Sequence, residues 1–224
     1  MILGIDSSDN FVSLGIVPDL GRRHVIISKS LPVDIKNKVL IHNFLSETLI
    51  EAGLEMNSLT GIAVTIGPGS FTGVRVGMAV AKGICWALSL PLAGVSSLMA
   101  IAHSHRSDCR KLLAIKDARR GEFYYAAYEY RKNQFDAVIE DSVGPPLEIM
   151  DMIAQGFIPI GPGLDALSKL SIFPKLSSSE SFNPNLVGAS VATLGLDKIQ
   201  NNDIIDINTA SPNYIRIPKP GKAV

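Results

Sequence analysis

Two short stretches contain the residue types and spacing that chemistry at a phosphate or a metal ion requires. Asp6 follows the apolar run 2–5 and precedes Ser7 and Ser8, so its carboxylate lies where a first buried strand is expected to end. Residues 67–77 read GPGSFTGVRVG and lie between an expected strand and an expected helix. A carboxylate at a strand end can hold a metal–phosphate complex, and glycines before a helix let backbone N–H groups approach an anion. Together they would suit an ATP-dependent kinase or ATPase.

The spacing within residues 67–77 nevertheless favours a packing turn. No lysine completes the pattern GxxxxGK[ST], and Thr72 stands where the dinucleotide pattern GxGxxG needs its third glycine. We therefore interpret the stretch as a tight turn with close helix packing. Likewise, we interpret Asp6 and the two serines as a turn in which the carboxylate accepts hydrogen bonds from backbone N–H groups.

The other reactive side chains form no recognisable site. No two of the histidines are four residues apart, the spacing that places two imidazoles on one helical face. His103 and His105 are expected to face solvent, and Cys85 is expected in the core of an apolar helix. The sequence predicts no catalytic residue, no metal site and no cofactor site.

These stretches must be positioned by alternating strands and helices. Strands are expected at 2–5, 11–17, 24–28, 61–66, 92–95, 112–115, 123–129, 135–139 and 157–160, and helices at 34–52, 72–88, 96–103, 147–155 and 186–196. Three strands and then helix–strand alternation occur twice, on either side of a polar junction at 103–111. The pattern predicts a duplicated α/β fold with mixed sheets flanked by helices, divided into halves 1–105 and 106–224.

The expected helix 72–88 is apolar around nearly its whole circumference. Small residues at 79, 83 and 87 form a ridge beside a ridge of larger ones at 76, 80, 84 and 88. Such a helix must be covered on more than one side. One cover is the chain's own sheet, and the other is the helix 34–52 or the helices of a partner. The residues predicted to form a partner interface are Ile41, Leu45, Val76, Ala79, Val80, Gly83, Ile84 and Ala87.

Composition limits the possible partners. The chain has 224 residues, with 21 Lys plus Arg against 21 Asp plus Glu, so its formal net charge is zero. A protein that binds nucleic acid by itself usually carries a basic surplus. The most apolar stretch, 78–95, contains Lys82 and is interrupted by Pro91, so no membrane span is predicted. Residues 1–5 lack a basic flank, and Cys85 and Cys109 form no disulfide framework, which points to the cytoplasm.

Four motifs in combination resemble the TsaB family, the bacterial dimerisation subunits in the synthesis of threonylcarbamoyladenosine on tRNA. They are ILGIDSS at 2–8, GPGSFTGVRVG at 67–77, KDARRGEFY at 116–124 and PNYIR at 212–216. The resemblance runs nearly end to end. It implies two ribonuclease-H-like halves of the actin, sugar-kinase and heat-shock-ATPase type.

The resemblance also implies a role without catalysis. The catalytic paralogue, TsaD, binds a metal through two histidines four apart, and the corresponding positions here are Ser97 and Ile101. Its second glycine-rich phosphate segment is replaced here by residues 116–122. One departure from the family pattern is Asn37 and Lys38, where a His-Ser pair is usual early in the first long helix.

The resulting hypothesis is a non-catalytic scaffold that dimerises with a TsaD-type transferase. A small ATPase subunit of the same complex is a further expected partner, tRNA is expected to be met only through the complex, and the isolated chain is expected to form a homodimer. The alternatives are an ATP-dependent small-molecule kinase or ATPase on the same fold, which would use Asp6 and residues 67–73, and, more remotely, a peptidase. A kinase should have a glycine-rich phosphate loop in both halves, and residues 116–122 do not contain one.

Overall fold

The computed structural model describes residues 1–19, 24–33, 41–105, 111–131, 134–170 and 182–216. The predicted helix start at 34–40, with Asn37 and Lys38, and the junction residues 106–110, with Cys109, lie outside these ranges. Strands are β1 (Ile2–Asp6), β2 (Phe11–Val17), β3 (Ile27–Pro32), β4 (Gly61–Gly67), β5 (Leu92–Ser96), β6 (Lys111–Arg119), β7 (Glu122–Arg131), β8 (Gln134–Gly144) and β9 (Ile158–Ile160). Helices are α1 (Ile41–Glu51), α2 (Phe71–Leu88), α3 (Ser97–Ser104), α4 (Pro146–Ala154), α5 (Leu164–Ser168) and α6 (Val187–Gln200), with 3-10 turns at Met56–Ser58 and Pro184–Leu186.

Two mixed sheets repeat one topology. The first has the strand order β3-β2-β1-β4-β5, and the second has β8-β7-β6-β9. In each sheet three antiparallel strands are followed by a parallel neighbour, which is β4 beside β1 and β9 beside β6. The predicted duplicated α/β architecture is confirmed.

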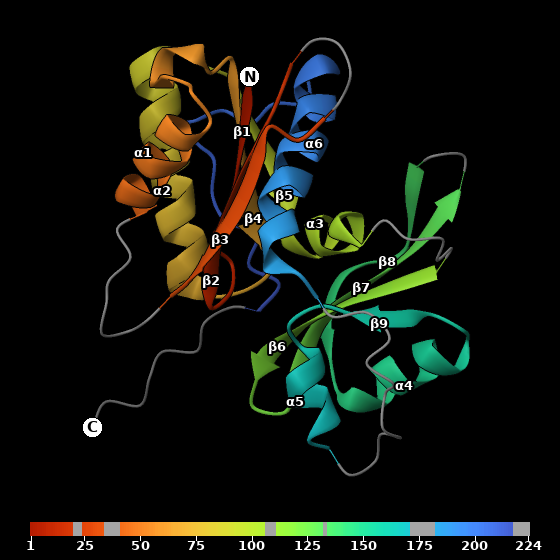
Figure 1. Cartoon of the computed structure of the whole chain (residues 1–224). Helices are drawn as coiled ribbons and strands as arrows, with labels where there is room; N and C mark the ends of the chain where they lie inside the picture. Colours follow the sequence, from red (N-terminus) through yellow and green to blue (C-terminus); the bar gives the residue numbers. More distant parts are fainter. Residues whose placement is uncertain (20–23, 34–40, 106–110, 132–133, 171–181, 217–224) are drawn as a thin grey trace.

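The first sheet is buried on both faces. Helices α1 and α2 cover one face, and α6 covers the other (Figure 1). Every residue of β1 and β2 is therefore buried, and neither strand shows the apolar–polar alternation of a sheet with one solvent-exposed face. Close approach of α6 depends on glycine, because a Cβ at Gly15 would lie 2.1 Å from the Ala189 nitrogen, and one at Gly188 would lie 2.3 Å from the Leu14 carbonyl carbon.

The position of α6 differs from the predicted division of the chain. Residue 105 falls between the two sheets, but α6, assigned by sequence to the second half, packs on β1, β2 and β4 of the first. Gly188 N donates a 2.8 Å hydrogen bond to Ser13 Oγ, across 175 residues of sequence. The first half is thus completed by the C-terminal part of the chain, because its sheet needs a cover on the face opposite α1 and α2.

Helix α3 links the two sheets. Leu98, Ile101 and Ala102 on this helix form one apolar cluster with Leu112 of β6 and Tyr128 of β7. His103, expected to face solvent, is 8% exposed at the end of α3. The predicted strand 24–28 is also displaced, since β3 begins only at Ile27, which pairs with Ile16 of β2.

Candidate functional site

The fold gathers the four motifs at the boundary between the two halves. Asp6 ends β1, and its Oδ1 accepts hydrogen bonds from Ser8 N at 3.1 Å, Ser8 Oγ at 2.6 Å and Thr65 Oγ1 at 2.6 Å. Asp6 is 2% exposed, and its Oδ1 is occupied by protein donors. The turn interpretation of Asp6 agrees with this geometry.

The glycine-rich stretch packs against that turn. Ser70 N donates to Ser8 O at 2.8 Å, and Ser7 Oγ donates to Gly73 O at 2.8 Å. A Cβ at Gly69 would lie 2.1 Å from Ser8 O, and one at Gly73 would lie 2.0 Å from Ser7 O. These glycines therefore let the loop and the start of α2 touch the backbone of the β1–β2 turn, as the packing interpretation predicts.

Lys116 closes the space between the halves. It lies on β6 and is 2% exposed, and its Nζ donates to Ser8 Oγ at 2.7 Å and to Ser8 O at 2.9 Å. Asp9 Oδ2 lies 3.5 Å from the same ammonium. A buried cation that belongs to the chain thus lies beside the turn where a kinase would place its metal–phosphate complex.

The structure also locates Ser97 and Ile101, the two positions that the resemblance is expected to match to metal ligands. Ser97 is buried, and its hydroxyl donates to the Pro68 carbonyl, while Ile101 belongs to the core. Among the described residues no three His, Cys, Asp or Glu side chains are grouped to hold a metal ion. A hydroxyl bonded to the backbone and an aliphatic side chain do not fit a metal site.

A second polar contact joins the halves beside α3. Ser96 Oγ caps the helix by accepting from Met99 N, and it donates to Asp141 Oδ1 on β8 at 2.8 Å. Burial raises the pKa of the Asp141 carboxyl to about 6, and the nearby Glu140 charge acts in the same direction, whereas the bond from Ser96 and the Lys116 charge oppose the rise. Burial also raises the pKa of the Tyr128 hydroxyl, with Asp141 as a further cause.

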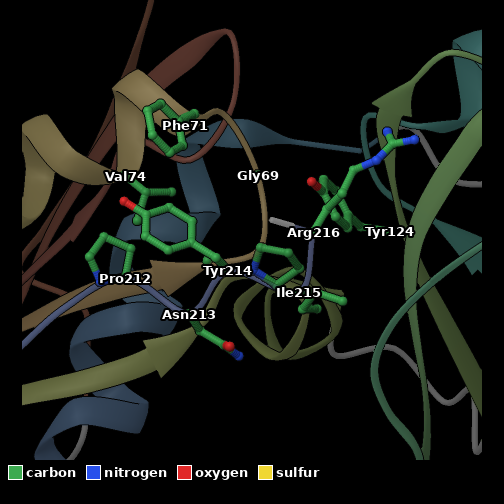
Figure 2. Close-up of a pocket in the computed structure, with 11 residues that line it drawn as sticks. Gly69, Phe71, Val74, Tyr124, Pro212, Asn213, Tyr214, Ile215 and Arg216 are labelled. Carbon is green, nitrogen blue, oxygen red and sulfur yellow. The ribbon is translucent and has the colours of Figure 1, made fainter. Parts of the chain in front are cut away.

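The C-terminal segment crosses from the first half to the second. Asn213 N donates to Ile66 O at 2.7 Å, and Arg216 Nη1 donates to Ala118 O at 3.0 Å and pairs with Glu122. Figure 2 shows this segment beside the loop at Gly69, with Phe71, Val74 and Tyr214 on one side and Tyr124 and Arg216 on the other. They line a cavity of about 150 Å³.

The outer face of α2 is a second candidate site. Ser70 caps the helix by accepting a hydrogen bond from Gly73 N. On its inner side Val74, Met78, Ala81 and Cys85 are buried, and burial raises the pKa of the Cys85 thiol to about 12. Among the described residues α2 is long and apolar enough to cross a membrane, with a mean hydropathy of 1.2, but its inner side belongs to the core of the first sheet.

The eight residues predicted for a partner interface divide between core and surface. Ala79, Gly83 and Ala87 are exposed, Val76 is 45% exposed, and a Cβ at Gly83 would meet nothing within 4 Å. Val80 and Ile84 are half-buried against the core. Ile41 and Leu45 are buried on the inner face of α1, so they offer no surface to a partner.

Two large exposed side chains were not among the predicted interface residues. Trp86 is 78% exposed and extends the spacing 72-76-79-83 by three residues, while Ile50 on α1 is also 78% exposed. A repeat of alternating steps of four and three residues marks a helix seam, and this signal could have identified Trp86. We call Val76, Ala79, Gly83, Trp86 and Ala87 the α2 outer face.

Comparison with known proteins shows the family to which the chain belongs. Residues 36–214 match the family model described as TsaD, tRNA N6-adenosine threonylcarbamoyltransferase. The tRNA threonylcarbamoyladenosine biosynthesis protein TsaB of Bacillus subtilis is 28% identical over 96% of this chain and 94% of its own length. The Escherichia coli protein of the same name is 32% identical over 54% of each chain.

Solved structures match the fold. A Pseudomonas aeruginosa protein described as similar to peptidase YEAZ superposes with a TM-score of 0.77 at 24% identity, over 96% of this chain and 99% of that one. YeaZ from the same organism gives a TM-score of 0.74 at 23% identity, over 95% and 98% of the two chains. The predicted fold class and the resemblance to TsaB are confirmed, and the chain belongs to the TsaD family of tRNA N6-adenosine threonylcarbamoyltransferases, in which its full-length relative carries the name TsaB.

Proposed function

We propose that this chain is a non-catalytic subunit that dimerises with a TsaD-type threonylcarbamoyl transferase and supports its modification of tRNA. The observation that carries the proposal is the α2 outer face, where small residues lie next to the 78% exposed Trp86. Exposed apolar patches on a soluble domain commonly mark association sites. Small residues at 79, 83 and 87 let a second helix approach closely, and Trp86 supplies the kind of aromatic anchor that dominates interface energies.

The closed boundary between the halves supports the non-catalytic part of the proposal. Asp6 Oδ1 accepts hydrogen bonds from Ser8 and Thr65, and the Lys116 ammonium lies beside the same turn. A metal–phosphate complex held by Asp6 would have to displace these contacts. The kinase alternative therefore receives no support from the residues that the sequence offered for it.

A small ATPase subunit remains an expected third partner of the complex. The cytoplasm is the compartment in which tRNA modification of this kind takes place, and we assign the chain to it on that ground.

Partner capture tests the proposal. A tagged full-length chain, expressed in its native cytoplasm, should recover a TsaD-type subunit in equal amount. Gly83→Leu places a branched side chain on the α2 outer face, and such overpacking should lower partner affinity by roughly ten- to a hundredfold. Asp151→Leu, which adds a leucine to the exposed side of α4, is the matched control and should bind normally.

Two results would contradict the proposal. One is wild-type affinity for the partner in the Gly83→Leu variant, with the fold intact by circular dichroism. The other is ATP turnover by the isolated chain that disappears on Asp6→Ala, which would favour the kinase alternative.

A further inference from the structure

The cavity between the glycine-rich loop and the C-terminal segment has the size of one planar ring. Its volume is about 150 Å³, and an apolar protein cavity of roughly that volume holds one benzene molecule. Tyr214 and Phe71 line one side, and Tyr124 and Arg216 line the other, with the Arg216 guanidinium turned toward Ala118 and Glu122 (Figure 2). Aromatic rings and guanidinium planes are the surfaces on which proteins stack the unpaired bases of RNA.

A guanidinium stacked on an aromatic ring lies at the rim of this cavity. The Arg75 guanidinium carbon is 3.6 Å from the Phe71 ring centroid, and its Nε donates to Tyr214 Oη at 2.7 Å. The Phe71 and Tyr214 rings are 5.2 Å apart. The bond to Tyr214 uses one of the five donors of a guanidinium, and the exposed Arg75 can direct others toward an anion.

The β6–β7 hairpin presents two more arginines on the other side. Its tip places Arg119 at φ 64° and Arg120 at φ 58°, followed by Gly121 at φ 78°. Glycine or asparagine would adopt these left-handed conformations at lower cost. Both arginines are exposed, Arg119 to 83% of its side chain, and Arg216 ties the tip to the cavity through its bond to Ala118 O.

The local charge is positive although the chain as a whole is neutral. Arg216 lines the cavity, Arg75 contacts the lining residues Phe71 and Tyr214, and Arg119 and Arg120 lie at the hairpin tip. The carboxylates paired with these four arginines are Asp117 and Glu122. Arginine is the side chain best suited to phosphate, because its planar donors match two phosphate oxygens at once. A ring-sized cavity flanked by such donors fits a nucleotide better than it fits a run of Asp and Glu side chains, which have no ring to fill it.

The cavity and the adjoining tip of the β6–β7 hairpin together form a surface that we call the groove. We propose that the groove binds one unstacked nucleotide of an RNA strand, with its base in the cavity against Tyr214 and Tyr124 and its neighbouring phosphates on Arg119 and Arg120. The choice of RNA rests on the proposed function, in which tRNA is the substrate of the complex. The groove would provide one contact to that tRNA on this chain, in addition to those made by the catalytic partner.

The test is fluorescence anisotropy of the full-length chain with a labelled single-stranded oligouridylate at increasing salt. Arg119→Gly with Arg120→Gly removes both charges and suits the left-handed backbone, so the variant should unfold at the same temperature or higher. The slope of log affinity against log salt should become shallower by about 1.4, because each phosphate contact on a single strand contributes about 0.7. Arg131→Gln with Lys169→Gln removes two exposed charges elsewhere and should leave the slope unchanged.

The ring contact is tested separately. Tyr214→Ala should weaken binding about five- to a hundredfold, the range for losing one base stack. Tyr214→Phe loses the bond from Arg75 but keeps the ring, so it should retain most of the affinity. A merely structural role of the Tyr214 hydroxyl would weaken both variants alike.

Three outcomes would overturn the proposal. The first is no binding of the oligonucleotide, and the second is an equal change of the salt slope in the Arg119→Gly, Arg120→Gly variant and in its control. The third is displacement of the RNA by polyglutamate as effectively as by unlabelled RNA. The last would identify an acidic-peptide site instead. Partner capture with the Gly83→Leu variant uses a different probe and a different substitution, so failure of the scaffold proposal is distinguishable from failure of the RNA site.

Discussion

At the scale of single residues, Lys116 and Asp141 form hydrogen bonds across the boundary between the halves. Both come from the second sheet, and both contact the first half through serine hydroxyls, at Ser8 and Ser96. A buried charged group whose partner is removed leaves its desolvation cost uncompensated. Substitution of each residue should therefore change the free energy of unfolding in its own way.

Lys116→Met keeps most of the side-chain volume but deletes the ammonium that binds Ser8 and lies 3.5 Å from Asp9. Because buried acceptors lose their donor, the free energy of unfolding should fall by about 2–4 kcal/mol, measured by urea denaturation. Lys111→Met at the start of the same strand is the control, since its partly exposed pair with Glu129 should contribute less than about 1 kcal/mol. Equal losses in the two variants would contradict a special role for Lys116.

The raised pKa of Asp141 predicts that the free energy of unfolding depends on pH. Its pKa in the folded chain is about 6, against an ordinary 3.8, so between these values the folded state binds the proton more tightly than the unfolded chain. The contribution of Asp141 to the free energy of unfolding should therefore fall as pH rises from about 4 to about 6, by about 3 kcal/mol at most. Urea denaturation at several pH values should show Asp141→Asn without this slope, and a slope that persists would assign the effect to another group.

At the scale of elements, glycine decides which helices can touch a neighbour. On the inner surface of α6, Gly188 meets the backbone of β2, and Gly4 and Gly15 on the strands meet the helix. On the outer surface of α2, Gly83 meets nothing within the chain. Adding a side chain should therefore destabilise the fold at the crowded glycines and be tolerated at Gly83.

Gly15→Ala should destabilise the fold strongly, because its Cβ would lie 2.1 Å from the Ala189 nitrogen, which belongs to the backbone and cannot move aside alone. The expected loss is about 3 kcal/mol or more. Gly83→Ala is the matched substitution in open space within a helix, and it should be neutral or stabilise by up to about 1 kcal/mol. Thermal unfolding of the two variants would contradict this account if their midpoints shifted in the same direction.

At the scale of the whole molecule, two separate surfaces are available to possible partners. The first half exposes the α2 outer face, and the boundary with the second half forms the groove at Tyr214 and Arg216. The two surfaces share α2, since Phe71 and Arg75 lie on its first turns and Trp86 on its last. A partner on α2 and an RNA strand in the groove would therefore be neighbours.

The isolated chain should self-associate through the α2 outer face, because without a partner the apolar surface around Trp86 is exposed to water. Sedimentation velocity should show a concentration-dependent dimer for the wild type. Gly83→Leu and Trp86→Ser should both shift it toward the monomer, whereas Leu147→Ser, at a 64% exposed side chain on α4, should leave it unchanged. A dimer that persists in both α2 variants would place the contact elsewhere.

Sequence alone was sufficient for the order of elements, the duplicated α/β fold and the family, because periodicity and turn residues act locally and the four motifs are specific in combination. It was not sufficient for the contacts between distant segments. The packing of α6 on the first sheet depends on Gly188 approaching β2 across 175 residues of chain, as the bond to Ser13 records, and nothing in the local pattern of 186–196 indicates it. In the same way, the sequence placed Ile41 and Leu45 beside the α2 residues as candidates for a partner, and only the tertiary packing of α1 buried them. A helical period identifies a face that must be covered, but the choice between the chain's own core and another molecule depends on which other segments fold against it.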